Sequence, residues 1–199
     1  MLKPYLYKNL TEAGVDEAGR GCLAGPVVAA AVILPKRFSH PVLTDSKQMS
    51  LKQRLATRDD ILKSALAWKV AFISSTEIDD MNVLRATWKA MHNALSGLTP
   101  QPQFIIVDGN RFLPYASLPF KTIVRGDSLF YSIAAASVLA KTARDEYMEA
   151  LHNDFPEFGW NQNKGYGTAA HRSAIERYGI TPHHRRSFTL TNSQLTIDF

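Results

Sequence analysis

The chain has 199 residues, 45% of them hydrophobic, which is ample for one core and short for two full domains, so we expect residues 1–199 to form one globular unit. Lys and Arg total 23 against 18 Asp and Glu, and the net charge of +5 suits a polyanionic partner, although many basic proteins have none. The single cysteine, Cys22, excludes an intrachain disulfide framework and a thiolate cluster for zinc. With no secretion signal and no run of roughly 20 apolar residues, we expect a cytoplasmic protein without a membrane role.

The hydrophobic pattern predicts five strands, at 12–17, 25–34, 68–74, 103–108 and 120–124. Helical spacing predicts helices at 51–67 after the N-cap Ser50, at 77–95, at 128–153 and, shorter, at 168–178. Because strands cluster early and helices follow, we expect an α/β fold with a mixed sheet and helices packed on it.

The sharpest local feature is the segment 15–21, which reads Val-Asp-Glu-Ala-Gly-Arg-Gly and places two carboxylates, Asp16 and Glu17, at a strand end. Adjacent side chains on a regular strand point to opposite faces, so both reach one site only at a strand end or an irregularity. Taken alone, the segment fits a solvated turn with a salt bridge to Arg20 equally well.

Two further acids, Asp108 and Asp127, also end apolar strands. Each alone fits a turn former or an N-cap, but burying several carboxylates together is unfavourable unless cations neutralise them. Four such acids therefore indicate a metal site. Oxygen-only ligands select hard cations such as Mg²⁺ or Mn²⁺, and two ions about 4 Å apart can activate water for attack on a phosphodiester.

Eight sequence blocks carry a family resemblance, in the order 15–21, 23–32, 44–47, 107–110, 125–128, 134–141, 164–168 and 184–188. In these blocks, which span nearly the whole chain, it resembles the type 2 ribonucleases H, specifically bacterial ribonuclease HII. Three departures are mild: Cys22 stands where proline is common, Gln48 where a second lysine often follows, and Arg125 where lysine is usual.

The resemblance implies a ribonuclease H-like fold, with a central mixed five-stranded sheet flanked by helices and a small C-terminal helical extension. Residues from about 156 to 188 would contact substrate, and those from about 189 to 199 would form a tail. It implies that Asp16, Glu17, Asp108 and Asp127 are the catalytic acids and hold Mn²⁺ or Mg²⁺, two ions once substrate is bound. Asp16 would bridge the ions, and Asp127 would begin the long helix.

The implied activity is endonucleolytic hydrolysis of the RNA strand of RNA–DNA hybrids, and cleavage 5′ to single ribonucleotides embedded in duplex DNA, by a monomer. The products would carry 5′-phosphate and 3′-hydroxyl ends, and the roles would be ribonucleotide excision repair and RNA primer removal. Such an enzyme must read the 2′-hydroxyl, which the resemblance assigns to the main chain of Gly19, Arg20 and Gly21 together with Tyr166. Further substrate contacts are expected from Ser46, Lys47, Lys164, Arg185 and Ser187.

Several of these residues also fit a purely structural role. Tyr166 alone fits a packed turn aromatic, most surface lysines bind nothing specific, and the adjacent His183 and His184 fit a structural role better than a hard-ion site. The end of the chain, with Gln194, Leu195, Ile197 and Phe199, is similar to the peptide by which bacterial replication and repair proteins dock on the sliding clamp. A frayed or packed terminus fits these few residues slightly better.

Two other functions fit the same acids. A different two-metal nuclease, such as a junction resolvase, would ignore the sugar of a single embedded ribonucleotide. A noncatalytic nucleic-acid binding module, with the acids as turn residues, would show no cleavage that depends on divalent ions and no metal titration.

Overall fold

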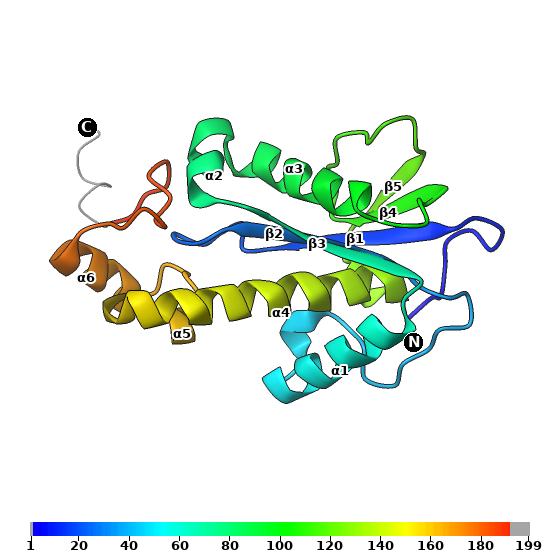
Figure 1. Cartoon of the computed structure of the whole chain (residues 1–199), viewed down its shortest axis with the longest axis horizontal. Helices are drawn as coiled ribbons and strands as arrows, with labels where there is room; N and C mark the ends of the chain where they lie inside the picture. The colour runs from blue at the N-terminus through cyan, green and yellow to red at the C-terminus, as the bar shows by residue number, and fades with distance from the viewer. Residues whose placement is uncertain (1, 192–199) are drawn as a thin grey trace.

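A computed structural model describes residues 2–191 (Figure 1). The strands are β1 (Glu12–Ala18), β2 (Val27–Ile33), β3 (Ala67–Ile73), β4 (Phe104–Asp108) and β5 (Phe120–Ile123). The α-helices are α1 (Leu51–Ser64), α2 (Ser75–Met81), α3 (Val83–Ser96), α4 (Tyr131–Asp154), α5 (Trp160–Asn163) and α6 (Ala169–Tyr178). Single 3₁₀ turns form η1 (Ser46–Gln48), η2 (Gly126–Ser128) and η3 (Pro156–Phe158).

The five strands form one mixed sheet in the order β3-β2-β1-β4-β5, which confirms the predicted fold class. β1 runs antiparallel to β2, and β2 runs antiparallel to β3. β4 is parallel to both β1 and β5. The carboxyl ends of β1, β4 and β5 therefore meet at the same end of the sheet, where acidic residues follow apolar runs.

Helices cover both faces of this sheet (Figure 1): α2 and α3 lie on one face and α4 on the other, with α1 packed beyond α4. β2 is buried along its whole length, and its residues alternate between the two layers. Ala29 and Ala31 belong to the cluster beneath α3, whereas Val28 and Ala30 belong to the cluster beneath α4. Alanines on both faces let the helices approach closely.

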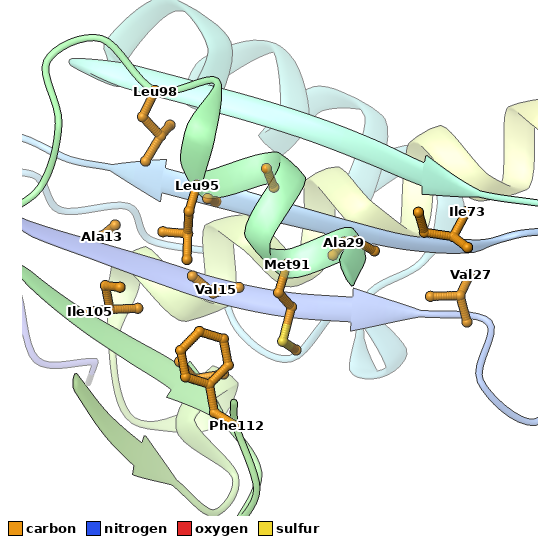
Figure 2. Packing of buried hydrophobic residues seen from close by; sticks show 14 of the residues in the cluster. Ala13, Val15, Val27, Ala29, Ile73, Met91, Leu95, Leu98, Ile105 and Phe112 are labelled. Atoms are coloured by element: carbon orange, nitrogen blue, oxygen red, sulfur yellow. The ribbon is translucent and has the colours of Figure 1, made fainter. Parts of the chain in front are cut away.

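Figure 2 shows the α3 side of the core, where Val15 of β1 and Ile105 of β4 pack beneath Met91 and Leu95. These positions show which side chains of β1 and β4 point to the α3 side of the sheet. Since side chains alternate along a strand, the residues next to Val15 point to the α4 side.

The first turn of α4 lies very close to the sheet at Gly14 of β1. A Cβ atom built there would lie 2.2 Å from the carbonyl carbon of Ser132 and 2.4 Å from the main-chain nitrogen of Ile133. Only glycine lets the strand contact the first turn of α4, and this contact brings that turn beside the carboxyl end of β1.

Three predicted helix boundaries are wrong. The helix predicted at 51–67 ends at Ser64, and Ala67 begins β3. The helix predicted at 77–95 is two helices, α2 and α3, separated by Asn82 at φ 70° and ψ 159°. The Asn82 side chain accepts hydrogen bonds from the N–H groups of Leu84 and Arg85 and so caps α3. The helix predicted from Ser128 begins instead at Tyr131, so Asp127 lies in η2 and not in the first turn of α4.

η3, α5 and α6 form a small helical part at the far end of α4 (Figure 1), as expected for the C-terminal extension. Its core contains Phe158, Trp160 and Ile175, which pack with Met148 of α4 and Leu23. No helix within residues 2–191 has the length and apolarity needed to cross a bilayer.

Candidate active site

Asp16 and Asp108 lie side by side on the α4 side of the sheet. The pairing of β1 with β4 ends at Val15 opposite Val107, and both valines point to the α3 side. The next residue on each strand is therefore an aspartate that points to the α4 side. Glu17, the next residue of β1, lines two hollows, one together with Ser137 of α4 and one together with Trp88 of α3.

Asp127 follows β5 in η2, close to Asp108. The Gly126 N–H donates to Asp108 Oδ1 at 2.7 Å, which ties this turn to the end of β4. Burial raises the pKa of Asp127 to about 6, with further contributions from the charges of Asp108 and Asp45 and an opposing one from Lys47. The short turn, and not the long helix, positions this acid.

The carboxylates at this end of the sheet are desolvated and near one another. Asp16 is 5% exposed, and its pKa is raised well above its usual range by burial and by the charges of Glu17 and Asp108. Burial also raises the pKa of Glu17, against the opposing effect of Arg20, whose Nη1 lies 3.2 Å from Glu17 Oε1. Ionising these acids together is therefore unfavourable without a compensating cation.

The residues present fit a hard divalent cation, because the acids offer only oxygen atoms. Three of the four acids accept hydrogen bonds from protein donors: Asp16 Oδ1 accepts the Glu17 N–H at 2.7 Å, Glu17 accepts from Arg20, and Asp108 accepts from Gly126. Among residues 2–191, no three His, Cys, Asp or Glu side chains are arranged as they would be around a bound ion. The role of these acids as metal ligands stays a prediction.

Three of the acids line neighbouring hollows. One of about 480 Å³ is lined by Glu17, one of about 290 Å³ by Glu17 and Asp108, and one of about 520 Å³ by Asp108 and Asp127. Lys47 lines the first and the third. Glu17, Asp108 and Lys47 are therefore the residues that these hollows share.

Ser46 and Lys47 lie in η1 beside these hollows. The Ser46 hydroxyl is buried 2.9 Å from the Ser137 hydroxyl of α4. Burial lowers the pKa of Lys47, but the charges of nearby aspartates outweigh burial and raise it, so this lysine is held in its charged form. The sequence blocks contained Ser137 without assigning it a role; its side chain hydrogen-bonds Asp16.

The main chain of residues 19–21 and the Tyr166 side chain line the 480 Å³ hollow. Gly19 adopts φ +90°, which favours glycine, and Tyr166 is 43% exposed. An isolated β-bridge joins Cys22 to Tyr166, so residues far apart in the chain come together here.

Three other predicted substrate contacts already have protein partners. Arg185 is fully buried and donates to main-chain carbonyls, so the predicted phosphate contact is wrong for this side chain. The Ser187 hydroxyl donates to Asp79 Oδ1 at 2.6 Å. Lys164 Nζ pairs with Glu149 and donates to the Asn161 carbonyl.

A buried histidine network supports Tyr166 from behind. His171 Nδ1 lies 2.9 Å from the Tyr166 carbonyl, and His171 Nε2 accepts from Trp160 Nε1 at 3.0 Å. His184 Nδ1 accepts the Thr181 N–H at 3.0 Å, and its Nε2 lies 3.2 Å from His171 Nε2. These contacts fit two neutral rings, with the first proton on Nδ1 and the second on Nε2.

This network predicts that the protein loses stability in acid. Burial, with the nearby His171 and His183, lowers the pKa of His184 from 6.5 to about 4. The unfolded chain thus takes up a proton at a higher pH than the folded chain, so stability is complete above pH 6.5 and falls as the pH drops toward 4. We expect His184 to account for a loss of about 2–3 kcal/mol across this window.

Urea unfolding at a series of pH values would measure this loss. In His184→Gln the titrating group is gone, so its stability should change less between pH 6.5 and 4 than that of the wild type. Parallel pH profiles for the two proteins would contradict the assignment.

The fold and the site define a class, an α/β protein with desolvated carboxylates at the carboxyl ends of its parallel strands, beside a glycine-flanked loop. The ribonuclease HII family profile matches residues 13–191. Ribonuclease HII of Bacteroides thetaiotaomicron is 55% identical over 200 residues, and that of Phocaeicola vulgatus is 54% identical over 201 residues. Each of these matches covers 100% of both chains. The chain belongs to the ribonuclease HII family, and it is a ribonuclease H enzyme.

Solved structures show the same fold. Ribonuclease H2 from Pyrococcus horikoshii has a TM-score of 0.76 at 26% identity, covering 92% of this chain and 96% of its own. The Archaeoglobus fulgidus ribonuclease HII, solved in complex with PCNA, gives a TM-score of 0.74 at 24% identity, covering 92% and 97%. Bst ribonuclease HIII in complex with Mn²⁺ gives 0.71 at 18% identity, covering 94% and 70%.

Proposed function

We propose that the protein hydrolyses the RNA strand of RNA–DNA hybrids and cuts 5′ to a single ribonucleotide embedded in duplex DNA. The products carry 5′-phosphate and 3′-hydroxyl ends. The observation that carries this proposal is that four acids lie close to residues 19–21, which we call the sugar-reading loop after their proposed role. Glu17, Asp108 and Asp127 line neighbouring hollows, Asp16 is buried beside Glu17 and Asp108, and residues 19–21 line the same hollow as Glu17.

The four acids would hold two Mn²⁺ or Mg²⁺ ions, which supply Lewis-acid stabilisation and a more acidic water when bound. Bst ribonuclease HIII, a relative in fold, was solved with Mn²⁺. Asp16 is held ready by the Ser137 hydroxyl and the Glu17 N–H. Glu17 would hold an ion after releasing Arg20, and its main chain is held by pairing with Ala29 of β2.

The other side chains position the substrate. Charged Lys47 lines two of the hollows and attracts a phosphate of the RNA strand toward the acids. Gly19 leaves room for Arg144, since a Cβ there would lie 2.0 Å from Arg144 Nε, and its φ of +90° shapes the loop so that main-chain groups of residues 19–21 reach the 2′-hydroxyl. The exposed Tyr166 ring packs on the adjoining sugar. A sugar that lacks the 2′-hydroxyl makes fewer of these contacts, which explains discrimination against DNA.

The test is cleavage of three duplexes of one sequence: an RNA–DNA hybrid, a DNA duplex with one ribonucleotide, and all-DNA. With Mg²⁺ or Mn²⁺ we expect the first two to be cut and the third to stay intact, and a chelator should stop both reactions. Cleavage indifferent to the ribonucleotide would favour a resolvase. Binding without cleavage under every ion condition would favour a noncatalytic module.

We further propose that the enzyme acts as a cytoplasmic monomer in ribonucleotide excision repair and RNA primer removal, with residues from about 156 to 188 as its substrate-contacting part. The predicted clamp-binding residues Gln194, Leu195, Ile197 and Phe199 lie outside the described residues. A clamp partner is retained as a proposal, with the PCNA complex of the Archaeoglobus fulgidus protein in its support. Unchanged clamp affinity after deletion of residues 194–199 would remove it.

A further inference from the structure

The Arg185 guanidinium is buried beneath the sugar-reading loop and joined to it by hydrogen bonds. Its Nη2 donates to the Gly19 carbonyl at 2.7 Å, and its Nη1 donates to the Arg20 carbonyl at 2.8 Å. Its Nε donates to the Gly25 carbonyl at 3.0 Å. The side chain is 0% exposed, so these carbonyls, and not substrate, occupy its donors.

Arg144 of α4 is likewise buried and donates hydrogen bonds to main-chain carbonyls, both in residues 24–26 and in the segment before Tyr166, which we call the tyrosine segment. It is 1% exposed, and its Nε donates to the Pro26 carbonyl at 2.9 Å and its Nη2 to the Ala24 carbonyl at 3.0 Å. Its Nη1 donates to the Lys164 carbonyl at 2.8 Å. One side chain thus connects the loop at residues 24–26 with the segment that carries Tyr166.

The choice of arginine has a physical reason. A guanidinium has five N–H donors in a fixed planar fork, so it can hold several carbonyls in one geometry, whereas a lysine ammonium has three donors on a flexible stem. Burial lowers the pKa of Arg185 to about 10, which leaves it charged at neutral pH. Placing two such charges in the interior is unfavourable without compensating contacts, and the carbonyls supply them.

Main-chain contacts also join the two loops, although neither belongs to a strand or a long helix. The Leu23 N–H donates to the Gly165 carbonyl at 2.8 Å, and the Arg185 N–H donates to the Leu23 carbonyl at 2.8 Å. A Cβ on Gly165 would lie 2.5 Å from the Ala24 carbonyl oxygen, so the segments already touch. The hydrogen bonds of the two arginines therefore lie between the Gly19 main chain and Tyr166, where they can fix the distance between these two groups.

We propose that Arg144 and Arg185 are positioning residues that fix the main chain of residues 19–21 relative to Tyr166, and so determine how efficiently a single ribonucleotide is recognised. The proposal rests on the proposed function. A continuous RNA strand offers a ribose at every register, whereas a single ribonucleotide must satisfy loop and tyrosine at once. Misplacing one relative to the other should therefore harm the second substrate more than the first.

The experiment compares kcat/KM for the single-ribonucleotide duplex with that for the hybrid, in the wild type, Arg144→Lys and Arg185→Lys. We expect this ratio to fall about 10-fold or more in both variants. A loss of folded protein alone would lower both activities equally and leave the ratio unchanged. Arg172→Lys is the control, because Arg172 also donates to two main-chain carbonyls, those of Thr189 and Leu190, but to no carbonyl of residues 19–26 or 164–166.

Gly165→Ala provides a variant that keeps both arginines. Its Cβ pushes the tyrosine segment away from Ala24, so it should lower the same ratio, and it decides the matter if a lysine variant does not fold. A ratio equal to that of the wild type in the folded variants would overturn the proposal. If the wild type itself fails to cut the single-ribonucleotide duplex, the proposed function falls first, which separates the two failures.

Discussion

Asp16→Asn should lower turnover by at least about a thousandfold while the affinity for an RNA–DNA hybrid stays nearly unchanged. Asn keeps the shape of the side chain but removes the charge that would hold a divalent ion, and such an ion supplies several kcal/mol of transition-state stabilisation. The groups that bind the strand, such as Lys47 and the Gly19 main chain, remain in place. Single-turnover cleavage and hybrid affinity, measured on the same preparation, would check both halves of this expectation.

The same variant should unfold no more easily than the wild type. Burial and the charges of Glu17 and Asp108 already disfavour the ionised Asp16, so a neutral side chain relieves an unfavourable interaction. Asp59→Asn, an identical chemical change on the exposed surface of α1, is the control and should cleave normally. Wild-type turnover in Asp16→Asn would remove the catalytic assignment.

Gly14→Ala should lower the free energy of unfolding by about 3 kcal/mol or more, or prevent folding altogether. The added Cβ would lie 2.2 Å from the Ser132 carbonyl carbon and 2.4 Å from the Ile133 nitrogen, both main-chain atoms of α4 that cannot rotate away. Relief requires the helix to move off the sheet and lose packing along its length. Urea unfolding followed by circular dichroism would measure the change.

Gly21→Ala is the matched control, because a Cβ there meets no atom within 4 Å. Its stability should differ from that of the wild type by less than about 1 kcal/mol. Equal stability of the two alanine variants would show that the contact between β1 and α4 is looser than the structure indicates.

Most of the fold could be predicted from the sequence, because its signals are local. The buried strands β2 and β4 are compact apolar runs, and every predicted strand is found within two residues of its observed bounds. The N-cap predicted at Ser50 is confirmed, since its hydroxyl accepts the Gln53 N–H. The gathering of acids follows from parallel strands that end together.

The remainder depends on contacts between distant residues or on single dihedral angles. The apolar spacing continues across Asn82, so periodicity could not reveal that a positive φ divides two helices. The start of α4 at Tyr131 likewise depends on Phe130, whose extended backbone at φ −130° and ψ 133° separates η2 from the helix and is not predicted by helix propensity. Basic residues near a nuclease site suggest phosphate contacts, and only the folded chain revealed that Arg185 is buried.

One stripe of α4 serves the whole site at successive turns. Ser137 contacts Asp16, Lys141 lines the large hollow, Arg144 holds the loop carbonyls, and Met148 lies against Gly25. These residues are spaced by four, three and four positions, which keeps them on one face of a helix with 3.6 residues per turn. A single inserted or deleted residue before Ser137 would rotate all four by about 100°. The helix α4 thus sets the distance between the catalytic acids and the loop proposed to contact the sugar. A substitution along this face changes one contact, whereas an insertion or deletion would displace all four.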